Sequence, residues 1–178
     1  MVYVFLAPGF EESEAICPID ILRRAGLDVV TVSVADDKVV TGAHGIPVIA
    51  DMCIEELDDP CPQAIVLPGG MPGTLNLDAS AKLKQYILDA AEDTLLCAIC
   101  AAPMVLGKLG LLCGKKATCY PGFEEHLVGA ALGGKVERDG RVITACGMGV
   151  AQQFGLAIAE ALVGSDAANA IEKAILLG

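Results

Sequence analysis

A cysteine at the end of a short apolar run is the residue of this sequence best suited to chemistry. Cys100 closes the apolar run 95–100, and a helix-forming segment, 101–107, follows at once. This pattern predicts a buried strand that turns sharply into a helix. Because the first N–H groups of a helix favour a thiolate over a thiol, we expect Cys100 to be a reactive nucleophile.

A thiolate that attacks a carbonyl group needs a partner that moves protons and donors that hold negative charge on oxygen. Glu14 is the candidate partner, because burial beside the sulfur would raise the pKa of its carboxyl group and keep it protonated. Gly70 and Ala101 are the candidate backbone donors of an oxyanion hole, and Gly69 would line the same space. For Glu11 and Glu12, an acidic first turn that complements the helix dipole is as good an explanation as a role in the site.

The other cysteines offer weaker alternatives. Cys97 and Cys100 form a C-x-x-C motif, but residues three apart on a strand lie about 10 Å apart, beyond the reach of a disulfide. A zinc site needs about four ligands, and the sequence has no second motif of this kind. We therefore expect Cys97 to be structural, while Cys119 and Cys146 remain candidates for a resolving thiol.

Three further residues could line the site. His44 lies in a glycine-rich excursion, whereas His126, the only other histidine, fits a surface helix. Tyr120, at the end of a short predicted strand, is better placed to face Cys100. Gly147 opens a Gly-Met-Gly turn that lacks the third glycine of a dinucleotide fingerprint, so a tight turn packed against the site is expected.

The rest of the chain predicts an α/β fold that brings these residues together. Short apolar runs alternate with amphipathic stretches, which is typical of a three-layer sandwich with a mostly parallel sheet and helices on both faces. The predicted strands cover residues 2–7, 29–34, 64–67, 95–100 and 117–120, the helices 12–25, 79–92, 101–107, 150–162 and 167–177, and the hairpins 39–50 and 136–145. The loops that follow the first, third and fourth strands would meet at the carboxyl edge of the sheet, where ligands bind in such folds.

Composition narrows the class of protein. With 178 residues, 54% of them hydrophobic, the chain suits a single domain over residues 1–178. A net charge of −11 and the absence of tryptophan argue against nucleic-acid binding. The N-terminus lacks the pattern of a secretory signal, and charges or prolines interrupt every long apolar run, so we expect a cytoplasmic protein with reduced thiols and no membrane span. No phosphate-loop or metalloprotease motif occurs, and neither a cofactor nor a metal is predicted.

Four segments together resemble the ThiJ/PfpI superfamily and, within it, the DJ-one branch associated with Parkinsonism. They are Gly9–Glu14, Leu67–Gly70, Ala98–Pro103 and Gly147–Gly149. The resemblance implies a flavodoxin-like fold, a homodimer, and a cysteine at a nucleophile elbow beside a protonated glutamate. By motif, the cysteine and glutamate are Cys100 and Glu14, and the oxyanion donors are Gly70 and Ala101.

Two departures from the superfamily pattern bear on function. Its protease-like branches place a histidine directly after the cysteine, where this chain has Ala101, so peptidase activity is not expected. The DJ-one branch keeps a histidine at the position of Tyr120, so we expect turnover either to be weak or to depend on Glu14 alone. The resemblance favours a cofactor-free glyoxalase or deglycase that acts on 2-oxoaldehydes or their adducts. The alternatives are a redox sensor in which Cys100 becomes a sulfinic acid, and a dimeric binding module without activity.

Overall fold

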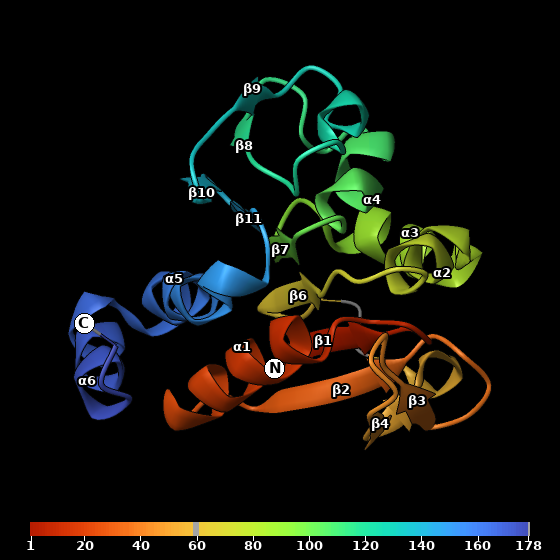
Figure 1. The fold of residues 1–178 in the computed structure, drawn as a ribbon, viewed down its shortest axis with the longest axis horizontal. Helices are drawn as coiled ribbons and strands as arrows, with labels where there is room; N and C mark the ends of the chain where they lie inside the picture. Colours follow the sequence, from red (N-terminus) through yellow and green to blue (C-terminus); the bar gives the residue numbers. More distant parts are fainter. Residues whose placement is uncertain (59–60, 178) are drawn as a thin grey trace.

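The computed structural model describes residues 1–58 and 61–177, which form a central sheet covered by helices on both faces (Figure 1). The seven strands of this sheet are β1 (Val2–Leu6), β2 (Val29–Ser33), β5 (Met52–Cys53), β6 (Ala64–Leu67), β7 (Leu95–Ile99), β10 (Val136–Asp139) and β11 (Val142–Ala145). Their order is β10-β11-β7-β6-β1-β2-β5, and only the β10–β11 pair is antiparallel.

The central strands are buried on both faces. Every residue of β1, β6 and β7 is buried, which explains why these strands are continuous apolar runs in the sequence. Because the strands are parallel, their carboxyl ends meet at one edge of the sheet. The segments that follow β1, β6 and β7 therefore converge there, as predicted.

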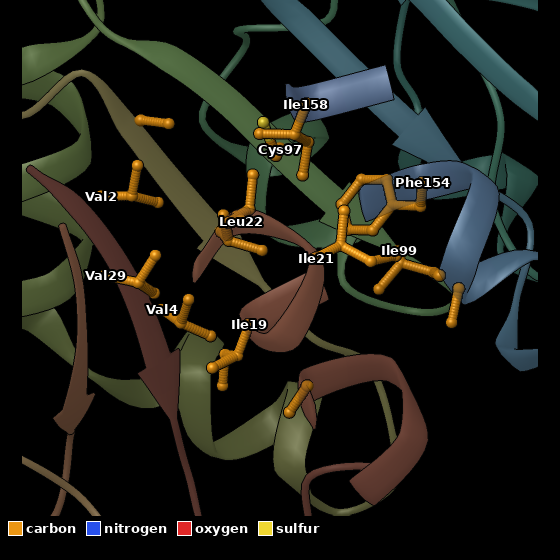
Figure 2. Packing of buried hydrophobic residues seen from close by; sticks show 14 of the residues in the cluster. Val2, Val4, Ile19, Ile21, Leu22, Val29, Cys97, Ile99, Phe154 and Ile158 are labelled. Carbon is orange, nitrogen blue, oxygen red and sulfur yellow. The ribbon is translucent and has the colours of Figure 1, made fainter. Parts of the chain in front are cut away.

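Helices α1 (Glu12–Arg24) and α5 (Ala151–Val163) cover one face, and α6 (Ser165–Ala174) packs against α5. Figure 2 shows Leu22 of α1 and Phe154 of α5 among the side chains of β1 and β7. A Cβ atom at Gly155 would lie 3.0 Å from both Pro18 Cα and Ile21 Cδ1. The close crossing of α1 and α5, which fixes the start of α1 over the sheet, therefore depends on this glycine.

The opposite face is covered by α2 (Gly73–Ala79), α3 (Ala81–Ala90) and α4 (Pro103–Lys108). Proline suits the first turn of α4, where its missing N–H would have no helical partner. Short 3-10 helices are formed by η1 (Ile54–Glu56), η2 (Glu124–His126) and η3 (Met148–Val150). Within the described residues, no helix combines the length and apolar character needed to cross a membrane.

Two small sheets stand outside the central one. The hairpin of β3 (Val39–Thr41) and β4 (Pro47–Ile49) confirms the predicted excursion. It docks on the segment after β1, since the N–H of Gly9 donates to the Thr41 carbonyl at 2.8 Å. The second small sheet pairs β8 (Lys116–Ala117) with β9 (Ala131–Leu132).

Most predicted elements are confirmed, and two predictions were wrong in extent. The strand expected over 117–120 is only β8, which ends at Ala117, so Tyr120 lies in a loop. The helix expected over 79–92 is α3, and a separate helix, α2, precedes it. Ser80 divides the two, because its side chain accepts a hydrogen bond from the Leu83 N–H at 3.2 Å and so caps α3.

Candidate active site

Cys100 occupies a strained turn at the carboxyl end of β7. Its φ angle of 63° lies in the left-handed region, which costs a non-glycine residue on the order of 1–3 kcal/mol. Two backbone hydrogen bonds hold it there: the Cys100 N–H donates to the Ala145 carbonyl, and the Cys100 carbonyl accepts from the Tyr120 N–H, both at 2.8 Å. The half-buried Cys100 side chain therefore has a fixed position at the sheet edge, which is the predicted elbow.

Glu14 lies in the first turn of α1 and is almost completely buried, with 1% of its surface exposed. Its side chain hydrogen-bonds with that of Cys100 and accepts from the backbone N–H groups of Gly69, at 3.0 Å, and Met148. Its own N–H donates to the carboxylate of Glu11, the residue that caps the helix, at 2.6 Å. Both the backbone and the side chain of Glu14 are thus held in place beside the thiol.

The two side chains perturb each other's titration. Burial raises the pKa of Glu14 to about 7, and the charge of Glu11 adds to the effect, although hydrogen bonds from Cys100, Gly69 and Met148 oppose it. Burial also raises the pKa of the Cys100 thiol to about 12, together with the charge and the hydrogen bond of Glu14. The backbone N–H groups of Ala101 and Gly70 point at the sulfur and lower the thiol pKa, but by less.

The N–H groups at the helix start favour a thiolate, as predicted, but the net shift of the Cys100 pKa is upward and not downward. The expected N–H donors are present, yet burial and the neighbouring carboxylate outweigh them. The two groups titrate as a coupled pair, in which the thiol retains its proton after the carboxyl has lost its own. Moving that proton along the hydrogen bond between the two side chains turns a thiol and a carboxylate into a thiolate and a carboxylic acid without changing the net charge.

Two adjacent glycines allow the backbone to come this close. A Cβ atom at Gly69 would lie 2.6 Å from both the Cys100 Cβ and the Glu14 Oε2. Gly70 has a φ of 92°, which glycine adopts without strain, and its N–H faces the sulfur. The structure thus brings together the four residues expected to form the centre of the site: Cys100, Glu14, Gly70 and Ala101.

Tyr120 and Gly147 also lie at the site. A Cβ atom at Gly147 would be 3.4 Å from the Tyr120 ring and 3.9 Å from the Glu14 Oε1. The neighbouring N–H donor of Met148 was missed by the sequence reasoning, because a backbone donor leaves no signal in residue type. The turn that carries it, Gly147–Gly149, was recognised.

His44 has a different position from the one predicted. Its ring Nδ1 lies 2.9 Å from the Glu12 Oε2, and its backbone N–H donates to the Glu12 Oε1 at 2.8 Å. Burial raises the pKa of Glu12, but the bonds from His44 and the Ile46 backbone N–H prevail and lower it to about 2. In the described part of the chain, His44 thus secures the β3–β4 loop to α1 rather than contacting Cys100.

A metal at this position would have to break those bonds. Ligand atoms of Glu11, Glu12 and His44 lie within 4.8 Å of one another. The Glu12 carboxylate already accepts three hydrogen bonds, and the Glu11 carboxylate caps α1. The three side chains are explained by their structural role.

The other cysteines differ from Cys100 in their surroundings. Cys97 is buried in the core between the sheet and α1, and it forms no disulfide with Cys100, as predicted. Cys119 is buried, and burial, with the charge of Glu124, raises its pKa to about 11. Cys146 is half-buried on the strand segment next to Cys100.

The fold and this constellation define a class of protein, and comparisons with known proteins agree. The profile of the DJ-1/PfpI family matches residues 1–161, and the chain belongs to that family. It is 37% identical to the Arabidopsis thaliana protein DJ-1 homolog B over 180 residues, which cover 99% of this chain and 41% of the relative. The chain thus spans less than half the length of this relative.

Shorter relatives match over most of their length. The Drosophila melanogaster protein dj-1beta is 36% identical over 98% of this chain and 95% of its own. A protein named deglycase from Pyrococcus abyssi is 32% identical over 74% of this chain and 78% of its own.

Solved structures confirm the flavodoxin-like α/β fold. A DJ-1 superfamily protein from Salmonella typhimurium, crystallised as a cysteine-to-alanine mutant, superposes with a TM-score of 0.94 at 35% identity, covering 99% of this chain and 98% of the other. Oxidized Toxoplasma gondii DJ-1 superposes with a TM-score of 0.90 at 37% identity, covering 98% and 97%.

The first prediction concerns Gly69. Substitution Gly69→Ala will raise the rate of Cys100 alkylation by iodoacetamide severalfold, because the added methyl group must separate the cysteine from Glu14, whose charge opposes loss of the thiol proton. Peptide mass spectrometry measures the rate at Cys100. The control is Gly149→Ala, where a Cβ atom would meet open space. Equal rates for both variants would contradict the described packing.

Proposed function

We propose that this chain is a cysteine-dependent, cofactor-free enzyme that converts 2-oxoaldehydes, free or as adducts, into 2-hydroxy acids. The observation that carries the proposal is the hydrogen bond between the Cys100 and Glu14 side chains, with the N–H groups of Gly70 and Ala101 aimed at the sulfur. The name deglycase of the Pyrococcus abyssi relative supports this class of substrate.

The first step is addition of sulfur to the aldehyde carbon. Glu14 takes the thiol proton, the sulfur lone pair forms the C–S bond, and the carbonyl electron pair moves to oxygen. The N–H groups of Gly70 and Ala101, which face the sulfur, also face an oxygen on the carbon bonded to it, so they stabilise the oxyanion. Glu14 then returns the proton to this oxygen, which gives a hemithioacetal and restores the carboxylate.

The second step moves hydrogen between the two carbons. The Glu14 carboxylate removes the proton from the former aldehyde carbon, and the C–H electrons form an enediolate with the neighbouring carbonyl. Glu14 then protonates the neighbouring carbon. The hydroxyl proton on the carbon bonded to sulfur passes to the oxygen of the neighbouring carbon, and a thioester of a 2-hydroxy acid results. One carbon is oxidised and the other reduced, so no external oxidant or reductant is needed.

The last step is hydrolysis of the thioester. Glu14 takes a proton from water as the water oxygen adds to the thioester carbon, the C–S bond breaks, and the sulfur leaves as a thiolate with its electron pair. The acid is released and the pair regains its single proton. With tyrosine at position 120, Glu14 is the proton carrier in every step.

This proposal predicts that the protein forms lactate from methylglyoxal in buffer free of metal and thiols. Cys100→Ser and Glu14→Gln will each lower kcat/KM at least about 100-fold, because the first removes the nucleophile and the second the proton carrier. The control is Glu160→Gln, an exposed glutamate of α5. Full turnover in Cys100→Ser would overturn the mechanism.

The second candidate function is a redox sensor that uses the same contacts. A Glu14 carboxyl with a raised pKa can donate a hydrogen bond to a sulfinate at Cys100, and the two N–H groups can hold its second oxygen. The oxidized state named for the Toxoplasma gondii structure favours this candidate. The homodimer and the cytoplasmic location expected from the sequence stay predictions.

Intact mass after mild hydrogen peroxide treatment separates the two functions. The sensor predicts a gain of two oxygen atoms that disappears in Cys100→Ala, together with no turnover of methylglyoxal. Oxidation that persists in Cys100→Ala would contradict it, because the oxidised sulfur would then belong to another residue.

A further inference from the structure

We infer that Lys135 selects substrates that carry an anionic group, a carboxylate or a phosphate, a few atoms from the reacting carbonyl. The inference rests on the proposed function, because it concerns substrates of the same cysteine. It assigns a role to a lysine outside the Cys100–Glu14 centre.

The register of the sheet places Lys135 near the nucleophile. Ala145 of β11 pairs with Ile99 of β7, so the next residues, Cys146 and Cys100, lie side by side at the sheet edge. The Cys146 N–H donates to the Lys135 carbonyl at 2.9 Å, which puts Lys135 one strand further out, at the start of β10. Since neighbouring strands lie about 4.8 Å apart, the Lys135 backbone is about 10 Å from that of Cys100. Figure 1 shows β10, β11 and β7 in this order.

A cavity of about 510 Å³ opens at this edge and has Lys135 in its wall. The other walls come from Tyr120, Pro121 and the segment 146–150. Gly147 joins the cavity to the catalytic centre, because a Cβ atom there would be 3.4 Å from the Tyr120 ring and 3.9 Å from the Glu14 Oε1. A molecule bound to Cys100 can therefore extend into the cavity.

The charge of the cavity wall is unusual for this protein. Among the described residues, Lys135 is the only charged one that lines the cavity, although the chain carries a net charge of −11. Its ammonium group forms no ion pair with a carboxylate of residues 1–58 and 61–177, whereas Lys38, Lys82, Lys108 and Lys116 each do. An exposed cation that no acid neutralises is available to a ligand.

These features define the chemistry of the ligand. Tyr120, Pro121, Met148 and Val150 offer apolar surface and no charge, which suits a short neutral carbon chain. The ammonium group of Lys135 suits one carboxylate or phosphate. The substrate class is therefore a 2-oxoaldehyde with an anionic tail, held by its carbonyl at Cys100 and by its tail at Lys135.

The kinetic test uses the full chain and compares three aldehydes: methylglyoxal, the phosphate ester of hydroxypyruvaldehyde, and the dioxopentanoate whose carboxylate stands two methylene groups from the 2-oxoaldehyde. Ion pairs at exposed sites are weak, so the expected effect is modest. Lys135→Met will lower kcat/KM for the better anionic substrate roughly three- to fivefold more than for methylglyoxal. Lys135→Arg will restore the preference, and high salt will abolish it. The better of the two anions identifies a carboxylate or a phosphate as the preferred tail.

The control is Lys173→Met on α6, which changes the net charge equally and will leave all three rates unchanged. If Lys173→Met lowered the preference for anionic aldehydes as much as Lys135→Met, the preference would come from the overall charge. If Lys135→Met lowered kcat/KM equally for neutral and anionic aldehydes, Lys135 would have a structural role. Either result overturns the inference.

A second readout does not need turnover. Cys100 is alkylated with N-iodoacetyl-β-alanine and with its neutral amide, and the ratio of the two rates is measured. Lys135→Met will lower this ratio, and Lys173→Met will not. If no aldehyde is turned over but the ratio falls, the proposed function fails and the anion site stands. An unchanged ratio overturns the anion site.

Discussion

Two groups that bind protons, the thiol of Cys100 and the carboxyl of Glu14, are buried against each other at the carboxyl edge of the sheet. Burial raises the pKa of both groups, and the charge of Glu14 makes loss of the thiol proton still more difficult, whereas the hydrogen bond from Cys100 favours the ionised carboxylate. The surrounding structure supplies backbone N–H groups from Gly69, Gly70, Ala101 and Met148, and no side-chain cation of residues 1–58 and 61–177 acts on the pair. Negative charge can therefore develop on the sulfur, on the carboxyl group or on a substrate oxygen without a permanent counter-ion.

The scaffold explains how such a pair is maintained. The strained φ of Cys100 is held by hydrogen bonds from two separate segments, and the start of α1 is held by its cap, by the hairpin and by the packing of α5 at Gly155. These hydrogen bonds and packing contacts thus offset the free-energy cost of the strained Cys100 backbone and of the buried Cys100–Glu14 pair. A change far from Cys100, at the α1–α5 crossing, would act on the site through the position of Glu14.

Much of this arrangement could be predicted from the sequence, because it depends on patterns. The apolar runs in the sequence predicted β1, β6 and β7. Because these strands were expected to be parallel, the residues that follow them, Glu14, Gly70 and Cys100, were expected at one edge of the sheet. The extra helix α2 was missed because its seven residues include glycine, threonine and asparagine, which are weak helix formers. The position of His44 and the N–H of Met148 depend on tertiary contacts between distant loops. The thiol pKa was predicted in the wrong direction, because the helix start was weighed without the burial of the pair.

The inferred role of Lys135 would allow a protein with a net charge of −11 to accept an anionic substrate. An unpaired lysine beside the nucleophile provides a local positive charge without placing a cation against the sulfur, where it would fix a permanent thiolate. Binding of the tail and movement of the proton are then separate tasks, performed by Lys135 next to β10 and by Glu14 of α1.

The measurement that tests the account most directly is a carbon NMR titration of the Glu14 carboxyl group in protein with labelled glutamate, with Glu14→Gln used to assign the signal. A titration near pH 7 is the predicted result, because the account requires a carboxyl group that gains and loses its proton beside the thiol. A titration near the ordinary value of 4.5 would contradict it, since Glu14 would then be a permanent carboxylate and could not exchange a proton with Cys100 at neutral pH.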